Sequence, residues 1–129
     1  MYHDNKYKKK GNRMSYFPFF KEIEGEKCLV IGGGKVAARK ISRLKGFGVK
    51  IKVVAPSIVS DIEAVVQACD YISVERRIFT PQDIENVDFV IAAAGEEVDK
   101  EATRLCKEKA IPVNVVDNQE LCDFIFPSI

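Results

Sequence analysis

Short apolar runs alternate along most of this chain with longer segments in which apolar residues recur at helical spacing. Apolar residues recur at helical spacing from Ala37 to Phe47 and from Ile58 to Cys69, and residues 97–109 also read as a helix. Gly46 and Gly48 are predicted to end the first of these helices. Thr80-Pro81 predicts the start of one further brief helix, because a hydroxyl cap followed by proline is typical of helix starts. Apolar runs typical of buried strands lie at residues 27–31, 49–54, 71–74, 89–93, 113–116 and 124–126.

This alternation predicts a Rossmann-type α/β fold, in which a doubly wound parallel sheet carries helices on both faces. We expect the strand order 3-2-1-4-5 and a ligand at the carboxyl edge of the sheet, where the order reverses. A single domain is predicted over residues 16–129, preceded by a basic tail at residues 1–15.

Composition agrees with one soluble globular domain, since the 129 residues are 47% apolar and 30% charged. No apolar run approaches the length of a membrane span or signal peptide, so we predict a cytoplasmic protein without a membrane partner. The only histidine is His3 and no C-x-x-C pair occurs, so no metal site is predicted. We expect buried, reduced thiols at Cys28, Cys69, Cys106 and Cys122.

The formal net charge of +1 conceals an asymmetry between the tail and the rest of the chain. Residues 1–14 hold five Lys or Arg against one Asp, whereas the remainder holds 15 Lys or Arg against 18 Asp or Glu. A short basic start of this kind is more often a solvated terminus than a nucleic-acid arm. We therefore predict no nucleic-acid partner.

A glycine-rich turn joins the first predicted strand to the first predicted helix. The sequence GGGKVA at residues 32–37 fits the pattern G-x-G-x-x-A of dinucleotide-binding loops. In that pattern Gly32 permits the tight turn, Gly34 lets the backbone approach a pyrophosphate, and Ala37 lets the helix pack closely on the strand. Backbone N–H groups at the helix start would hold the anion. We predict a dinucleotide site here, against the alternative of a turn without a ligand.

One feature of the usual dinucleotide pattern is missing from the second predicted strand. An acidic residue near the end of this strand commonly binds the ribose hydroxyls, but VVAP occupies residues 53–56 here. Ser57 or the backbone around Pro56 could hold the ribose instead. The loop by itself therefore leaves the choice between NAD and NADP open.

Asp117 follows the predicted strand at residues 113–116, on the edge of the sheet where the ligand is expected. A carboxylate in a partly buried cleft suits a proton acceptor. Asp117-Asn118 is equally good turn chemistry, so spacing alone leaves both interpretations open.

The chain resembles the precorrin-2 dehydrogenase family, which includes the N-terminal part of sirohaem synthases. GGGKVAARK, NVVD and FIFPS together are far more specific than the glycine pattern alone. The resemblance runs through FPFF at 17–20, CLVIGGGKVAARK at 28–40, VVAP at 53–56, VIAA at 90–93, NVVD at 114–117 and CDFIFPSI at 122–129.

The resemblance implies an oxidoreductase that uses NAD to convert precorrin-2 to sirohydrochlorin in sirohaem biosynthesis. Both tetrapyrroles would be small-molecule ligands, and some members of the family also insert Fe²⁺ as a substrate. The family pattern implies that Asp117 is the catalytic residue. The predicted cofactor-binding residues are Gly32, Gly33, Gly34, Lys35, Val36, Ala37, Pro56, Ser57, Ala93 and Ala94.

Two departures from the family pattern are visible. The acidic loop after the fourth strand, usually ATDD, reads AAGEE from Ala93 to Glu97, which keeps the acidic character and loses the threonine. The family also continues beyond Ile129 into a segment that forms a homodimer, so the oligomeric state of this chain stays open. Because the substrate is polyanionic, we expect a basic rim, with candidates Arg39, Lys40, Arg43, Arg76 and Arg77.

Two other functions compete with the dehydrogenase. One is a non-catalytic Rossmann module that senses NAD(H), and the other is a truncated fragment that binds NAD without turnover. NVVD followed by FIFPS favours the enzyme, because a sensor has no need of Asp117.

Overall fold

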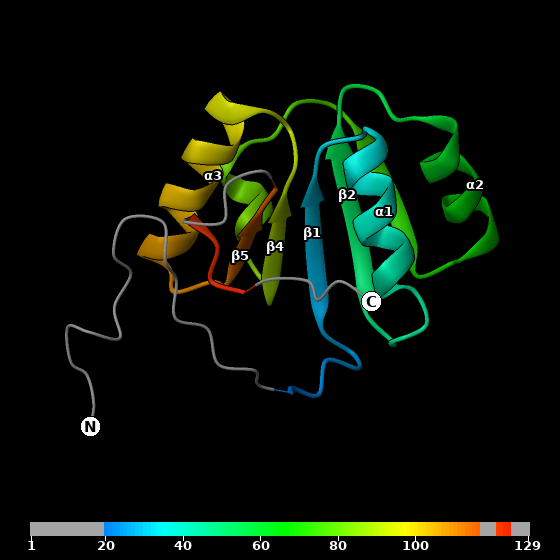
Figure 1. The fold of residues 1–129 in the computed structure, drawn as a ribbon, viewed down its shortest axis with the longest axis horizontal. Coiled ribbons are helices and arrows are strands. Elements are labelled where there is room, and N and C mark those ends of the chain that lie inside the picture. Colours follow the sequence, from blue (N-terminus) through cyan, green and yellow to red (C-terminus); the bar gives the residue numbers. More distant parts are fainter. Residues whose placement is uncertain (1–19, 117–120, 125–129) are drawn as a thin grey trace.

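The computed structural model describes residues 20–116 and 121–124, and these residues form one five-stranded sheet (Figure 1). The strand order is β3-β2-β1-β4-β5, and every neighbouring pair is parallel, which confirms the predicted topology. The strands are β1 (Lys27–Ile31), β2 (Lys50–Ala55), β3 (Ile72–Arg76), β4 (Phe89–Ala92) and β5 (Val113–Val115).

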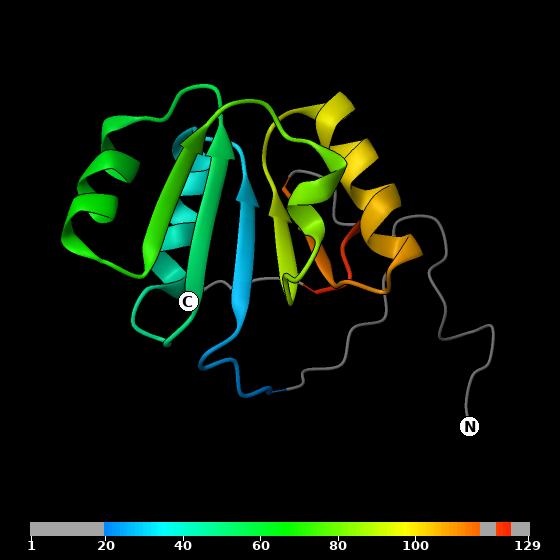
Figure 2. The same ribbon diagram turned by 180° about the vertical axis from the view of Figure 1, so that it is seen from behind.

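Helices cover both faces of the sheet, as expected of a doubly wound fold. Helices α1 (Lys35–Leu44) and α2 (Ser60–Ala68) lie on one face. Helix α3 (Glu96–Glu108) and the short 3₁₀ helix η2 (Pro81–Ile84) lie on the other face (Figure 2). The predicted N-cap at Thr80 is present, in a capping box with Asp83.

The core divides into two layers that share the central strand β1. Cys28 and Val30 belong to the layer beneath α1, whereas Leu29 and Ile31 belong to the layer beneath α3. All four side chains are at most 1% exposed. A parallel strand buried on both faces reads as a continuous apolar run, which is why residues 28–31 lack the alternation of a half-exposed strand.

Two helices end before the last apolar residue of the stripe that predicted them. Helix α1 ends at Leu44, and Gly46 adopts a φ of +95°, so the chain turns before Phe47, which is 60% exposed. The prediction that Phe47 continues the buried stripe is therefore wrong. Helix α2 ends at Ala68, and Cys69 beyond it is half-buried. Of the residues within α2, only Ile62 is fully buried, because this helix packs against α1 and the edge strand β3.

The chain after β5 protects the edge of that strand instead of adding a strand of its own at Phe124. The Asp123 carboxylate accepts a hydrogen bond from the backbone N–H of Val113 at 3.1 Å, and the Asp123 N–H donates to the Val113 carbonyl at 2.8 Å. The Cys122 sulfur accepts from the N–H of Val115 at 3.1 Å. These bonds provide partners for backbone N–H and C=O groups that an edge strand otherwise leaves without hydrogen bonds. The other predicted strand positions, 125 and 126, lie outside the described residues.

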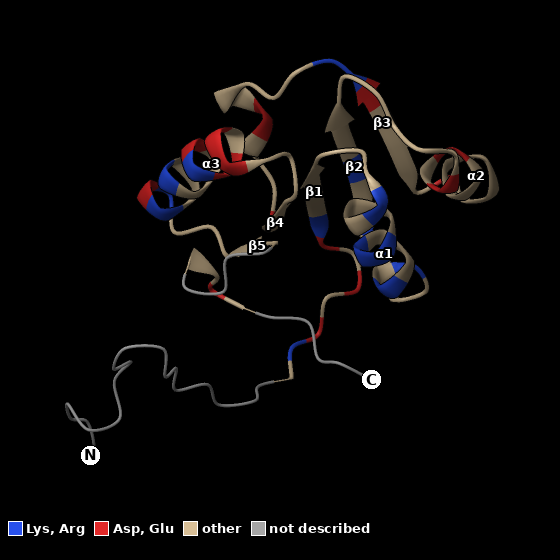
Figure 3. Cartoon of the chain, turned by 45° about the horizontal axis from the view of Figure 1, so that its top comes forward, with Lys and Arg blue, Asp and Glu red and all other residues tan. Residues whose placement is uncertain are grey.

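Charge is distributed unevenly over the helices (Figure 3). Helix α1 contains four basic residues and no acidic one, whereas α3 mixes both signs. Within residues 20–116 and 121–124, no helix combines the length and apolarity that crossing a bilayer requires.

Candidate functional site

The candidate site lies at the carboxyl end of the central strands. Strand β1 pairs with β2 on one side and with β4 on the other. The chain leaves β1 toward α1 on one face of the sheet and leaves β4 toward α3 on the opposite face. Such a divergence opens the crevice in which doubly wound proteins bind their ligands.

Gly32 and Gly33 are required by close contacts between three loops. Gly32 adopts a φ of +125°, and a Cβ on it would lie 2.2 Å from the carbonyl oxygen of Ala93. A Cβ on Gly33 would lie 2.1 Å from the carbonyl oxygen of Ser57. The Gly33 carbonyl accepts a hydrogen bond from the N–H of Val59 at 2.9 Å. These two glycines therefore bring the loops after β2 and β4 against the loop after β1.

Gly34 differs from its two neighbours because nothing in the fold requires a glycine there. Its φ of −91° is open to any residue, and a Cβ on it would meet no atom within 4 Å. The open space beside Gly34 borders two clefts, both of which Gly34 and Ala93 line. A ligand that approaches the bare backbone at this point accounts for the third glycine, and the pyrophosphate of a dinucleotide fits that requirement.

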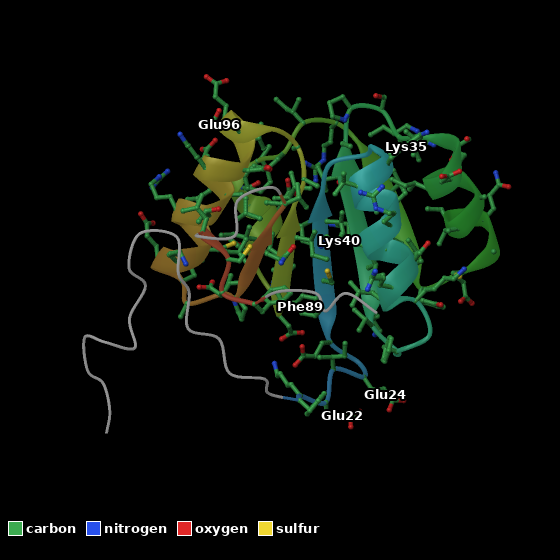
Figure 4. All side chains as sticks on the ribbon, in the orientation of Figure 1. Glu22, Glu24, Lys35, Lys40, Phe89 and Glu96 are labelled. Atoms are coloured by element: carbon green, nitrogen blue, oxygen red, sulfur yellow. The ribbon has the colours of Figure 1, made fainter. Side chains whose placement is uncertain are left out.

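No side chain of α1 offsets the positive potential at its amino end. Gly34 is the N-cap and offers no side-chain hydrogen bond, and the first turn contains no acidic residue. The first turns of α2 and α3 contain two and three acidic residues, respectively. Lys35 adds a positive charge at the first position of α1, at the end of the molecule where Glu96 begins α3 (Figure 4). A helix start with open N–H groups and no acidic side chain favours a phosphate ligand.

The first cleft lies on the β2 side of the glycine loop and has a volume of about 490 Å³. It brings the predicted residues Pro56, Ser57 and Ala94 together with the three glycines. Ile78 and Phe79, which follow β3, also line it and were not predicted as site residues. Ile78 is 70% exposed although it is large and apolar. Two large apolar residues shortly after a strand end, on the edge where the ligand is expected, were the signal available in the sequence.

The second cleft lies on the β4 and β5 side and has a volume of about 450 Å³. It contains the predicted residues Lys35, Val36 and Ala37 as well as Ala93 and Gly34. Its other lining residues come from α3 and from the chain around β5: Gly95, Glu96, Asp99, Lys100, Val115, Val116 and Leu121. The structure thus gathers all ten predicted cofactor-binding residues in two adjoining clefts. Asp117, the predicted catalytic residue, lies outside the described residues.

Asp99 is a residue of the second cleft that the sequence prediction missed. Its side chain is 5% exposed, and one carboxylate oxygen accepts a hydrogen bond from the N–H of Ala94 at 2.9 Å. The Asp99 N–H donates to the Gly95 carbonyl at 2.9 Å, so this residue closes the turn between β4 and α3. Asp99, Ala102, Thr103 and Cys106 are the buried residues of α3. An aspartate at helical spacing with buried residues was the missed signal.

The basic residues proposed for a rim lie in two places. Arg39, Lys40 and Arg43 belong to α1. Arg76 and Arg77 lie at the carboxyl end of β3, and both are paired with carboxylates. Arg76 pairs with Glu63 of α2, and Arg77 pairs with Glu75 and with Asp83 of η2.

These ion pairs perturb the acid–base equilibria of the groups involved. Hydrogen bonds from Arg77 and then Lys52 lower the pKa of Glu75. Burial raises the pKa of Asp83, but hydrogen bonds from Arg77 and Thr80 outweigh burial and hold that pKa below its ordinary value. The pairing with Asp83 and Glu75 raises the pKa of Arg77. All three groups are therefore stabilised in their charged forms.

Cys69 and Cys122 are half-buried, so the prediction that all four thiols are buried is wrong for these two. Cys28 and Cys106 are buried, and burial raises the pKa of both thiols, that of Cys106 to about 11. Burial also raises the pKa of Cys122. Thiols with raised pKa values are protonated at neutral pH and are poor nucleophiles and metal ligands. Across the part of the chain that the structure describes, no three His, Cys, Asp or Glu side chains gather into a potential metal site.

Comparison with known proteins agrees with this geometry. A model of the family described as "Putative NAD(P)-binding" matches residues 19–128. The siroheme synthase of Nitrosomonas eutropha is 43% identical over 117 residues, which cover 90% of this chain and 25% of that protein. The siroheme synthase of Thioalkalivibrio sulfidiphilus is 41% identical over 117 residues, covering 90% and 24%, respectively. Among solved structures, "SirC, precorrin-2 dehydrogenase" is similar with a TM-score of 0.70 and 25% identity, over 88% of this chain and 55% of that chain.

The share of each protein that is covered differs between the curated relatives and the family model. This chain spans about a quarter of the length of the curated siroheme synthases it resembles. The family model, in contrast, spans the whole described sheet, the glycine loop and both clefts. The chain therefore belongs to the family of putative NAD(P)-binding domains.

Proposed function

We propose that this chain oxidises precorrin-2 to sirohydrochlorin, with NAD⁺ as the coenzyme, in the biosynthesis of sirohaem. The observation that carries the proposal is the bare backbone at Gly34, which borders both clefts beside the uncapped start of α1. The names of the similar proteins, siroheme synthase and precorrin-2 dehydrogenase, support the choice of substrate.

The residues of the two clefts divide the binding of the dinucleotide between them. The backbone of Gly32, Gly33 and Gly34, with the start of α1, would hold the pyrophosphate. Pro56 and Ser57 in the first cleft would contact the adenosine half, since they follow β2. The second cleft would then receive the nicotinamide and the tetrapyrrole. NAD⁺ supplies the hydride acceptor that a two-electron oxidation requires.

Asp117 is the proposed proton acceptor of the reaction. The tetrapyrrole loses a proton as its conjugation extends, and the Asp117 carboxylate would take up that proton. Val116, the residue before Asp117, lines the second cleft, and its N–H donates to the Ala92 carbonyl at 3.0 Å. In those family members that insert Fe²⁺, the same carboxylate would accept the pyrrole N–H protons.

The basic face of α1 is the proposed docking surface for the carboxylates of the tetrapyrrole. Lys35, Arg39 and Arg43 are spaced by four residues along an exposed face of this helix. Like charges at this spacing repel by about 0.2–0.5 kcal/mol a pair, and a polyanionic ligand would relieve that repulsion.

The decisive experiment combines binding and turnover. We would titrate the purified chain with NAD⁺ in a calorimeter and then mix it, without air, with NAD⁺ and freshly made precorrin-2. NADH and sirohydrochlorin should appear together, and a parallel reaction with Fe²⁺ tests for metal insertion. Asp117→Ala should keep NAD⁺ binding and lose turnover. Asp61→Ala is the matched control, because it removes an exposed aspartate of α2 that lines neither cleft.

The outcomes separate the competing functions. Absence of saturable NAD⁺ binding refutes the dinucleotide site itself. Binding without turnover refutes the oxidation by this chain and favours either a module that senses NAD(H) or a fragment that binds NAD without turnover. Full turnover in Asp117→Ala refutes the role of that aspartate alone.

A further inference from the structure

The first cleft is lined almost entirely by apolar groups. Among the described residues that line it, none has a charged side chain or a side-chain amide, and Ser57 contributes the only hydroxyl. Every other lining residue is glycine, alanine, proline or a larger apolar residue. The second cleft differs, because Lys35, Glu96 and Asp99 are among its lining residues. A ligand group in the first cleft therefore meets apolar side chains rather than charged groups or side-chain amides.

Ile78 forms part of this apolar wall and is held there by its neighbours. Residues 77–80 cross the carboxyl edge of the sheet on the way from β3 to η2 (Figure 2). Arg77 is bound to the Asp83 carboxylate, and its Nη1 donates to the Ile78 carbonyl at 3.1 Å, which fixes the backbone of this segment. The Ile78 side chain stays 70% exposed, whereas Phe79 beside it packs against the core beneath α3. A large apolar side chain held exposed on a cleft wall is a surface that an apolar ligand group would cover.

Several backbone groups of the first cleft are already hydrogen-bonded within the fold. The Gly33 carbonyl accepts a hydrogen bond from the Val59 N–H at 2.9 Å, and the Ala94 N–H donates to a carboxylate of α3 at 2.9 Å. The Ile78 carbonyl accepts the bond from Arg77 described above. These backbone groups are therefore less available to recognise the polar edge of a nucleotide base.

We propose that Ile78 contacts the purine base of the coenzyme and that the first cleft binds this base without recognising its polar edge. The base is expected on this side because Pro56 and Ser57, which follow β2, line the same cleft. An apolar pocket discriminates weakly between ligands of the same shape, whereas a site built to hydrogen-bond a group rejects an analogue without it by about 10⁴–10⁵-fold. The domain should therefore bind dinucleotides whose base is adenine or hypoxanthine with similar affinity. The inference rests on the dinucleotide binding proposed above.

The first test compares NAD⁺ with nicotinamide hypoxanthine dinucleotide, in which an oxygen replaces the amino group of adenine. Both dissociation constants are measured by calorimetry on the full, unaltered chain. They should differ by less than about tenfold, because loss of one neutral hydrogen bond corresponds to a factor of about ten at most. A larger preference for either dinucleotide overturns the inference, since it shows that the cleft recognises the polar edge of the base.

Ile78→Ser tests the contact itself. NAD⁺ should bind about tenfold more weakly, as expected when a ligand no longer covers a large apolar side chain. ADP-ribose, which keeps the base and lacks the nicotinamide, should lose the same factor. Phe47→Ser is the matched control, because Phe47 is also large, apolar and 60% exposed but lines neither cleft. Circular dichroism should show both variants folded, since both side chains lie largely in solvent.

The outcomes distinguish this inference from the proposed function. Unchanged NAD⁺ affinity in Ile78→Ser overturns the contact, as does an equal loss in Phe47→Ser or a loss for NAD⁺ that ADP-ribose does not share. Absence of saturable NAD⁺ binding by the unaltered chain overturns the dinucleotide site, and this inference with it.

Discussion

Replacing Gly34 with alanine should weaken coenzyme binding and leave folding intact, whereas the same change at Gly32 should destabilise the fold itself. At Gly34 the added methyl meets no atom within 4 Å and the φ of −91° suits alanine. The same methyl at Gly32 lies 2.2 Å from the Ala93 carbonyl oxygen, at a φ of +125°. The two sites are two residues apart on one loop, so each substitution controls for the other.

The magnitudes follow from these contacts. Gly34→Ala should raise the free energy of unfolding by about 0.4–1 kcal/mol, because alanine restricts the unfolded chain. The same substitution should lower the free energy of unfolding by a similar amount, about 0.5–1 kcal/mol, because alanine is a poor N-cap. Its free energy of unfolding should therefore change by less than about 1 kcal/mol. Gly32→Ala adds about 1–3 kcal/mol of backbone strain and about 1–3 kcal/mol of overpacking. That sum is a large share of the roughly 5–15 kcal/mol that stabilises a domain.

The expected loss of affinity comes from the phosphate contacts. A methyl on Gly34 keeps a pyrophosphate from the backbone N–H groups, and a hydrogen bond to a charged group contributes about 1.5–3 kcal/mol. NAD⁺ should therefore bind roughly ten- to a hundredfold more weakly for each such bond lost. Urea unfolding followed by circular dichroism measures the stability, and calorimetric titration measures the affinity. Unchanged NAD⁺ affinity in a folded Gly34→Ala chain would refute the placement of the coenzyme at this glycine.

Three further measurements test the charges and thiols of the fold. The pKa of Asp83 is lower in the folded than in the unfolded chain, so its ionised carboxylate stabilises the fold at pH values above the ordinary aspartate pKa of about 4. This stabilisation is lost as the pH falls below that value and through the lowered pKa. Asp83→Asn should therefore flatten the decline in unfolding free energy between about pH 5 and pH 2 in urea titrations; an unchanged slope contradicts the lowered pKa. Cys28 and Cys106, whose pKa values burial raises, should react with a disulfide reagent at pH 8 only after addition of urea, and peptide mass spectrometry would reveal any labelling of the native chain. Asp99→Ala should lower the free energy of unfolding by about 1 kcal/mol through loss of its bond to the Ala94 N–H, whereas Asp99→Asn, which keeps an acceptor, should lose less; equal losses would show that this bond is unimportant.

The pattern of apolar and polar residues correctly predicts those structural features that depend on residues nearby in the chain. Residues 27–31 form the strand that the apolar run predicts, and the strand order follows from the alternation of strands and helices. Apolar spacing was misleading at Phe47, which was assigned to the helical stripe although Gly46, predicted as a helix end, turns the chain before it. It also missed Asp99, whose burial depends on the turn it closes between β4 and α3.

The sequence by itself determined the α/β class, the strand order and the position of the glycine loop, because each is encoded in spacings within a few turns of chain. Only the tertiary structure distinguished the roles of the glycines. Gly32 and Gly33 are required by carbonyl oxygens of Ala93 and Ser57, which lie far along the chain, while Gly34 faces open space. The pairing of Arg76 with Glu63 likewise depends on β3 lying beside β2. Contacts between loops are set by how the sheet assembles, and no local pattern records that assembly.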